Sequence, residues 1–176
     1  TTFFHVFCAA VARTLHERPQ LNRYVLGGRV FQREGVEVSF AVKKGIRDEA
    51  ALTMVKVALS PEDGLADVRR KVDAAILIGR GADRTTVEHE LAVLNRLPMF
   101  VTRALVALAA RLDRWNLLPA ALIRDDPNHV GAMLTNLGSI GLGASFHHLS
   151  DYGTASIVVA LGRVDRQPAV TDEGTL

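Results

Sequence analysis

The sequence predicts an α/β (α+β) two-layer sandwich, in which a mixed β-sheet carries helices packed on one face. Two kinds of segment support this class: segments whose apolar residues recur with helical spacing, and segments that alternate strictly between apolar and polar residues. The two kinds are mixed along a chain of 176 residues, a length typical of one domain. A composition of 48% hydrophobic and 23% charged residues is that of an ordinary globular protein.

The first third of the chain predicts a helix followed by strands. Residues 1–19 have apolar positions at steps of three and four, and Pro19 ends the pattern. Gly27 and Gly28 predict a turn that leads into a short strand. Residues 36–42 alternate cleanly, with apolar side chains on one face, and residues 52–59 are a further candidate strand. The expected buried stripe of the helix consists of Phe4, Phe7, Val11 and Leu15.

A second helix is predicted to start near Ser60, a suitable N-cap that is followed by Pro61 and two acidic residues. Its expected buried stripe is Leu65, Val68, Val72 and Ile76. Residues 87–115 predict one or two more helices divided near Pro98, the second of them unusually apolar. That helix suits a core or a subunit interface. A membrane-surface role would require a basic polar face, which the sequence indicates only weakly.

The last third returns to strands. Residues 130–138 are strand-like and end in glycine, and residues 154–164 form a nearly continuous apolar strand, as expected when both faces are covered. The glycine-rich stretch from Gly138 to Ser145 matches neither a dinucleotide fingerprint nor a P-loop, so we interpret it as a tight turn between strands.

Composition excludes several classes of function. The net charge is only +2, so no nucleic-acid partner is expected. The single cysteine, Cys8, falls in an apolar helical pattern typical of a buried, inert thiol in a reducing compartment. No apolar run is long enough to span a bilayer, and we expect a cytoplasmic protein. No metal site is expected, because the scattered histidines lack the spacing of metal ligands; they are His5, His16, His89 and His129. Residues 124–128 are interpreted as charged residues of a solvent-exposed loop.

One motif resembles an acid–base site. In HHLSDYG, His147 or His148 could pair with Asp151 as a general base and its orienting partner. Adjacent residues of an extended chain point to opposite faces, so at most one of the two histidines can share a pocket with Asp151. Spacing alone leaves the role of this motif open.

Three segments together resemble the acyltransferase (dihydrolipoamide acyltransferase) catalytic domain of 2-oxo acid dehydrogenase complexes, the fold shared with chloramphenicol acetyltransferase. Residues 4–42 resemble the entry helix of that family, its Pro-x-x-Asn corner at Pro19 and Asn22, and the hairpin that leads to a long strand. LTNLGSIG resembles the Ser/Thr-Asn-x-Gly strand end, and TASIVVALGRV the central strand that follows. The resemblance implies one catalytic domain over residues 1–176, truncated at both ends, with an extended helical insertion at 80–128.

The resemblance also implies where the chemistry lies. The catalytic H-x-x-x-D-G motif of the family follows the central strand, whereas HHLSDYG precedes it, so His147, His148 and Asp151 are interpreted as a loop or subunit contact. We expect the polypeptide to continue beyond Leu176 to that motif; a truncated, inactive relative is the alternative. Thr135 occupies the position of the hydroxyl that stabilises the oxyanion, although threonine is also simply a good strand residue. Asn136 and Gly138 are expected to shape the turn.

By this resemblance the protein is a coenzyme A-dependent acyltransferase. It would move an acyl group between coenzyme A and a thiol such as dihydrolipoamide, with the lipoamide carried on a separate domain or protein. A homotrimer, a larger cage and other components of a 2-oxo acid dehydrogenase are the implied partners. The alternative is a non-catalytic scaffold that forms the trimer or cage and has lost the catalytic histidine, with the added helices serving assembly or partner docking.

Overall fold

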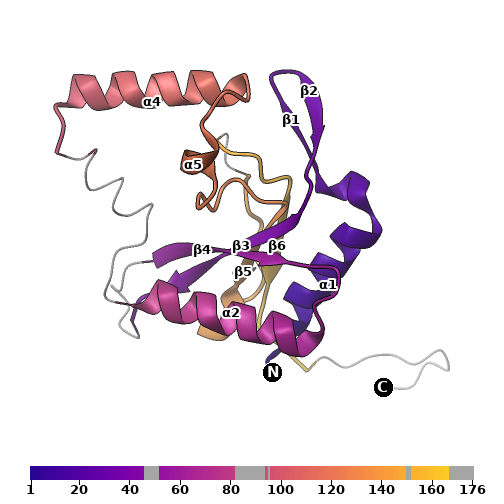
Figure 1. Ribbon diagram of the computed structural model, residues 1–176. Coiled ribbons are helices and arrows are strands. Elements are labelled where there is room, and N and C mark those ends of the chain that lie inside the picture. Colours follow the sequence, from indigo (N-terminus) through magenta and orange to yellow (C-terminus); the bar gives the residue numbers. More distant parts are fainter. Residues whose placement is uncertain (46–51, 82–93, 95, 150–151, 167–176) are drawn as a thin grey trace.

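A mixed sheet lies at the centre of the protein. The structure, a computed structural model, describes residues 1–45, 52–81, 94, 96–149 and 152–166 (Figure 1). In this part of the chain the sheet has four strands in the order β4-β3-β5-β6. β3 and β4 are antiparallel, whereas β5 runs parallel to both β3 and β6. The strands are β3 (Val36–Lys43), β4 (Leu52–Leu59), β5 (Ala132–Asn136) and β6 (Ile157–Leu161).

Two helices, α1 (Phe3–Glu17) and α2 (Leu65–Arg80), pack on one face of this sheet, which confirms the predicted fold class. α1 contacts β3 and β5, and α2 contacts β4 and β3. The apolar stripe of α1 buries Phe4 and Leu15 as predicted, but the residues between them that face the sheet are Cys8 and Ala12. Phe7 and Val11 are only half-buried, because they lie at the border of the stripe.

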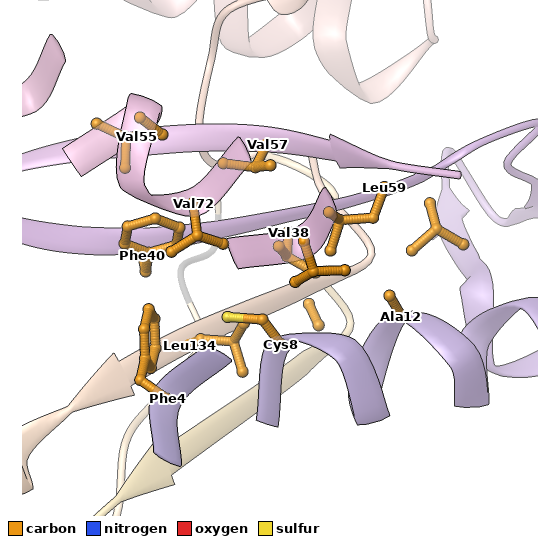
Figure 2. Packing of buried hydrophobic residues seen from close by; sticks show 14 of the residues in the cluster. Phe4, Cys8, Ala12, Val38, Phe40, Val55, Val57, Leu59, Val72 and Leu134 are labelled. Atoms are coloured by element: carbon orange, nitrogen blue, oxygen red, sulfur yellow. The ribbon is translucent and has the colours of Figure 1, made fainter. Parts of the chain in front are cut away.

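The core between the layers is built from alternating strand residues. Val36, Val38, Phe40 and Val42 all point toward the helices, as their spacing predicts. Figure 2 shows Phe4 of α1 pointing toward Phe40 of β3, and the two rings meet edge to face with centroids 5.2 Å apart. This geometry adds to the stabilisation from burial of apolar surface.

The predicted start of the second helix is wrong by one turn. α2 begins at Leu65 with Gly64 as N-cap, not at Ser60. The carboxylate of Asp63 accepts a hydrogen bond from the backbone N–H of Ser60 and forms an ion pair with Lys71. These contacts close a separate turn over residues 60–63 before the helix starts.

A short 3-10 helix and a hairpin connect α1 to the sheet. The 3-10 helix η1 (Pro19–Asn22) precedes β1 (Arg23–Leu26) and β2 (Arg29–Gln32). Gly27 and Gly28 both have positive φ, which confirms the predicted turn, because side chains disfavour that conformation. The side chain of Asn22 is buried and donates to the carbonyl of Gly35, joining the corner to the start of β3.

The apolar segment after Pro98 forms α4 (Met99–Arg114), as predicted, and is followed by the short helix α5 (Ala120–Ile123). Of the predicted helical stretch at 87–115, residues 87–93 and residue 95 lie outside the described residues. Asp113 is the one buried residue of α4, so the helix adds no apolar side chain to the core formed by the described residues. Figure 1 shows α4 on the side of the sheet away from α2. None of the described helices combines the length and the apolar composition needed to cross a membrane.

The glycine-rich segment differs from its prediction as a tight turn between strands. It opens with the 3-10 helix η2 (Leu137–Ile140), and β6 then pairs parallel to β5. A tight turn cannot join parallel strands, which require a crossover connection. β6 also lies at the edge of the described sheet, with four of its five residues half-buried, so the expected covering of both faces is not found among the described residues.

Candidate functional site

Thr135 lies near the end of β5, on the face of the sheet that the core helices do not cover. Leu134 is 1% exposed and points into the core, and side chains alternate along a strand, so Thr135 points to the opposite face. Its backbone is held in register opposite Ala160 of β6. The side chain is half-buried, and the hydroxyl makes no hydrogen bond within the described part of the chain.

The turn after Thr135 is closed by its own side chains. Oδ1 of Asn136 accepts a hydrogen bond of 3.3 Å from the backbone N–H of Ser139. The hydroxyl of Ser139 donates in return to the carbonyl of Asn136, at 2.7 Å. Asn136 therefore caps η2, and the chain leaves the strand sharply beside Thr135.

Gly138 lies where two backbone segments meet. A Cβ atom at this position would be 2.6 Å from the carbonyl oxygen of Gly162 and 3.1 Å from Cα of Arg163. Both are backbone atoms, which cannot move aside as a flexible side chain could. Only glycine permits this close approach between η2 and the residues that follow β6.

The HHLSDYG motif lies elsewhere. His147 and His148 are exposed, in a segment without regular secondary structure, and Nδ1 of His147 lies 3.1 Å from the carbonyl oxygen of Phe146. Asp151 lies outside the described residues. In the described part of the chain no hydrogen bond or ion pair joins either histidine to Thr135, so the assignment of this motif to a loop or subunit contact stays a prediction.

A buried polar cluster was missed by sequence reasoning. His129 is 6% exposed, and its ring lies between the carboxylates of Asp126 and Asp113. The Nδ1–Oδ2 distance to Asp126 and the Nε2–Oδ1 distance to Asp113 are both 3.1 Å. Tyr152 packs edge to face against the imidazole, with ring centroids 5.5 Å apart. The interpretation of residues 124–128 as solvated loop charge is wrong for Asp126, which is buried.

The cluster shifts the pKa values of His129 and Asp126. Burial alone would lower the pKa of His129, but the hydrogen bonds and charges of Asp126 and Asp113 outweigh it and raise the pKa above its usual value. Burial likewise opposes ionisation of Asp126. Hydrogen bonds from His129, Asn128 and Tyr152 prevail, however, and lower the pKa of Asp126 to about 2. The two carboxylates therefore favour the protonated form of the His129 imidazole that lies between them.

A cavity of about 260 Å³ adjoins this cluster. Nζ of Lys56 lies 2.9 Å from Oε2 of Glu37 in its wall. Both nitrogens of His129 are occupied by carboxylates, so the imidazole cannot act there as a general base. Nor are three His, Cys, Asp or Glu side chains grouped suitably for a metal ion anywhere in the described residues. The charged lining residues are Arg33, Glu37, Lys56, Asp113, Arg124 and His129.

Only part of the cluster could have been found in the sequence. Asp126 and His129 are three residues apart, a spacing that indicates a local pair, but nothing in the pattern points to Asp113. The structure also separates the two polar sites along β5: His129 precedes the strand, and Thr135 lies near its far end. His129 lies three residues before the strand begins, so the two backbones are at most about 20 Å apart.

Several solved structures resemble this fold. A probable dihydrolipoamide acetyltransferase from Listeria monocytogenes 4b F2365 matches with a TM-score of 0.56 and 18% identity, over 98% of this chain and 55% of that one. The dihydrolipoamide acetyltransferase of Azotobacter vinelandii, in which the catalytic roles of a serine, a histidine and an asparagine have been investigated, matches with a TM-score of 0.52 and 18% identity. That match covers 98% of this chain and 53% of the other. The chain has the dihydrolipoamide acetyltransferase fold.

The cubic core of a pyruvate dehydrogenase multienzyme complex matches equally well, with a TM-score of 0.52 and 18% identity over 98% of this chain and 53% of that one. At this identity the likeness establishes the acetyltransferase fold alone. The chain spans about half the length of these proteins. No protein-family model matches the chain, and no curated protein matches it by sequence.

Proposed function

We propose that the protein is a coenzyme A-dependent acyltransferase of the 2-oxo acid dehydrogenase type, acting between coenzyme A and a thiol such as dihydrolipoamide. The observation that carries this proposal is the half-buried hydroxyl of Thr135, which has no hydrogen-bond partner in the described structure and stands on a rigid strand of an acetyltransferase fold. A donor of this kind costs little reorganisation when negative charge develops on a substrate.

The proposed reaction exchanges one carbon–sulfur bond for another. The acceptor thiol loses its proton to a base, and its thiolate attacks the thioester carbonyl. The resulting tetrahedral oxyanion accepts a hydrogen bond from Thr135, and the bond to the sulfur of coenzyme A then breaks. That sulfur takes up a proton as the acyl group remains on the acceptor, so atoms and charge balance.

Other parts of the proposal come from the family resemblance. The base would be a histidine in H-x-x-x-D-G, a motif that these 176 residues do not contain. The site would form between subunits of a homotrimer, which could assemble further into a cage with other 2-oxo acid dehydrogenase components. Lipoamide would arrive on a separate domain or protein, in a cytoplasmic setting.

The exposed apolar side chains of α4, which could serve assembly or partner docking, favour a second candidate, a trimer- or cage-forming scaffold without activity. Acetyl transfer from acetyl-coenzyme A to dihydrolipoamide separates the two. If the protein as it occurs is an acyltransferase, it catalyses this transfer, and Thr135→Ala lowers kcat about 10²- to 10³-fold while Thr135→Ser retains most of it. Thr14→Ala, on the exposed face of α1, is the matched control.

The outcomes are distinct. If the unaltered protein catalyses transfer and Thr135→Ala has the same rate, the protein is an acyltransferase but Thr135 is not part of its active site. If the unaltered protein catalyses no transfer but forms a trimer or larger assembly in analytical ultracentrifugation, the scaffold function is supported and the enzyme function is rejected.

A further inference from the structure

α4 presents large apolar side chains to solvent. Phe100 is 75% exposed, Trp115, directly after the helix, is 67% exposed, and Leu108 between them is 53% exposed. The helix forms no extensive packing interface with any other described helix or strand. Large apolar side chains exposed together on one helix indicate an interaction surface for another protein, a membrane or a ligand.

The charges of this segment are one-sided. From residue 96 to residue 124 the chain has five arginines and a single acidic residue, Asp113. Asp113 is buried against His129, so it contributes no negative charge to the surface. On α4 itself every exposed charge is therefore positive and comes from Arg103, Arg111 and Arg114. Arg96 precedes the helix, and Arg124 is followed directly by the exposed Asp125.

The arginines and the apolar side chains share one side of α4. At about 100° per residue, Arg103, Arg111 and Arg114 fall within an arc of about 80°. Phe100 lies inside this arc, and Leu108 and Trp115 lie beside it. Arginine side chains that flank apolar residues can extend to polar headgroups while the apolar residues enter the acyl boundary.

We propose that α4 is an interfacial helix that lies on an anionic lipid surface. A two-fold contact with a second copy of this chain fits the helix poorly, because it would place the arginines of α4 against those of the other copy. A trimer contact joins different surfaces and is distinguished by the concentration dependence described below. Anionic headgroups supply the opposite charge, and a tryptophan at the end of the helix suits the membrane interface. This proposal does not depend on acyl transfer.

Trp115 gives the test a local probe, because it is the only tryptophan of the sequence. The unaltered protein is mixed with vesicles of phosphatidylcholine alone or of phosphatidylcholine with about a third phosphatidylglycerol, an anionic lipid. Flotation together with a blue shift of Trp115 emission is expected for the anionic vesicles. Both are expected to weaken at high salt, which screens the arginines.

Two pairs of variants locate the surface. Arg103→Gln with Arg111→Gln should lower the partition coefficient about 30-fold, since each arginine near an anionic surface contributes about 1 kcal/mol. Arg69→Gln with Arg70→Gln, two exposed arginines of α2, is the matched control and should change it little. Leu108→Ser should abolish the blue shift, whereas Leu77→Ser on α2, at 72% exposure, should not. Circular dichroism establishes that each variant is folded.

Any of three results overturns the proposal: no flotation with anionic vesicles, equal loss in the α2 controls, or equal binding to phosphatidylcholine alone. A blue shift that appears without vesicles and grows with protein concentration assigns α4 to contacts between copies of the chain instead.

Discussion

The Nε2 atom of His129 lies 3.1 Å from Oδ1 of Asp113, a residue sixteen positions earlier and next to the C-terminus of α4. This contact joins α4 to the residues just before β5. The other nitrogen of the same ring contacts Asp126, so a single imidazole ring connects two buried carboxylates. Removing the charge of His129 or of one carboxylate is expected to destabilise the protein, because the remaining charged partner stays buried without compensation.

His129→Gln should reduce the free energy of unfolding by about 3 kcal/mol at mildly acidic pH. The folded-state pKa of His129 is raised, so its contribution is complete below the ordinary value of about 6.5 and is lost as pH rises through the folded value. Denaturant unfolding of both proteins at a series of pH values measures the difference. The difference in the free energy of unfolding between the two proteins should become smaller at alkaline pH. A difference that does not depend on pH would contradict a charged His129.

Asp126→Asn should also destabilise the protein by about 3 kcal/mol at neutral pH, because it removes the charge that faces His129. The pKa of Asp126 is lowered to about 2, so its contribution is present above the ordinary value of about 4 and is lost as pH falls through 2. The exposed neighbour, in Asp125→Asn, is the control and should change stability by less than about 0.5 kcal/mol. Equal effects of the two variants would mean that burial of Asp126 is unimportant.

Gly138→Ala should disturb the turn beside Thr135. The added methyl group would meet the carbonyl oxygen of Gly162 at 2.6 Å, so backbone must shift, at a cost of about 1–3 kcal/mol. Gly143→Ala, in the same segment, meets no atom within 4 Å and serves as the control. Thermal unfolding compares the two. Equal melting temperatures would show that the close approach to Gly162 is readily relieved.

Cys8 should be unreactive in the folded protein. Burial raises the pKa of its thiol to about 12, and the thiolate is the reactive form. Ellman's reagent at mildly alkaline pH should therefore modify the protein only after denaturant is added. Because the sequence has one cysteine, the absorbance reports this residue alone. Rapid modification without denaturant would indicate that α1 opens from the sheet.

Much of the fold follows from local patterns. Val36, Val38, Phe40 and Val42 alternate, and a strand places such residues on one face whatever surrounds it. The Gly27–Gly28 turn and the helix after Pro98 were likewise predicted, because glycine and proline act on the backbone directly. The start of α2 was not, since the contact between Asp63 and Lys71 competes with the predicted cap at Ser60.

The candidate site, too, was predicted from the sequence only in part. The position of Thr135 at the end of a strand followed from the sequence, but the face to which it points became clear only once Leu134 was seen in the core.

Residue order and side-chain chemistry alone determined the strands, the two core helices and the buried position of Cys8, because periodicity and backbone preference act over a few residues. Tertiary structure decided that Asp113 meets His129, that Gly138 abuts Gly162, and that the apolar residues of α4 remain on the surface. These contacts join segments far apart in the chain, and no local pattern encodes where a helix lies once it has formed.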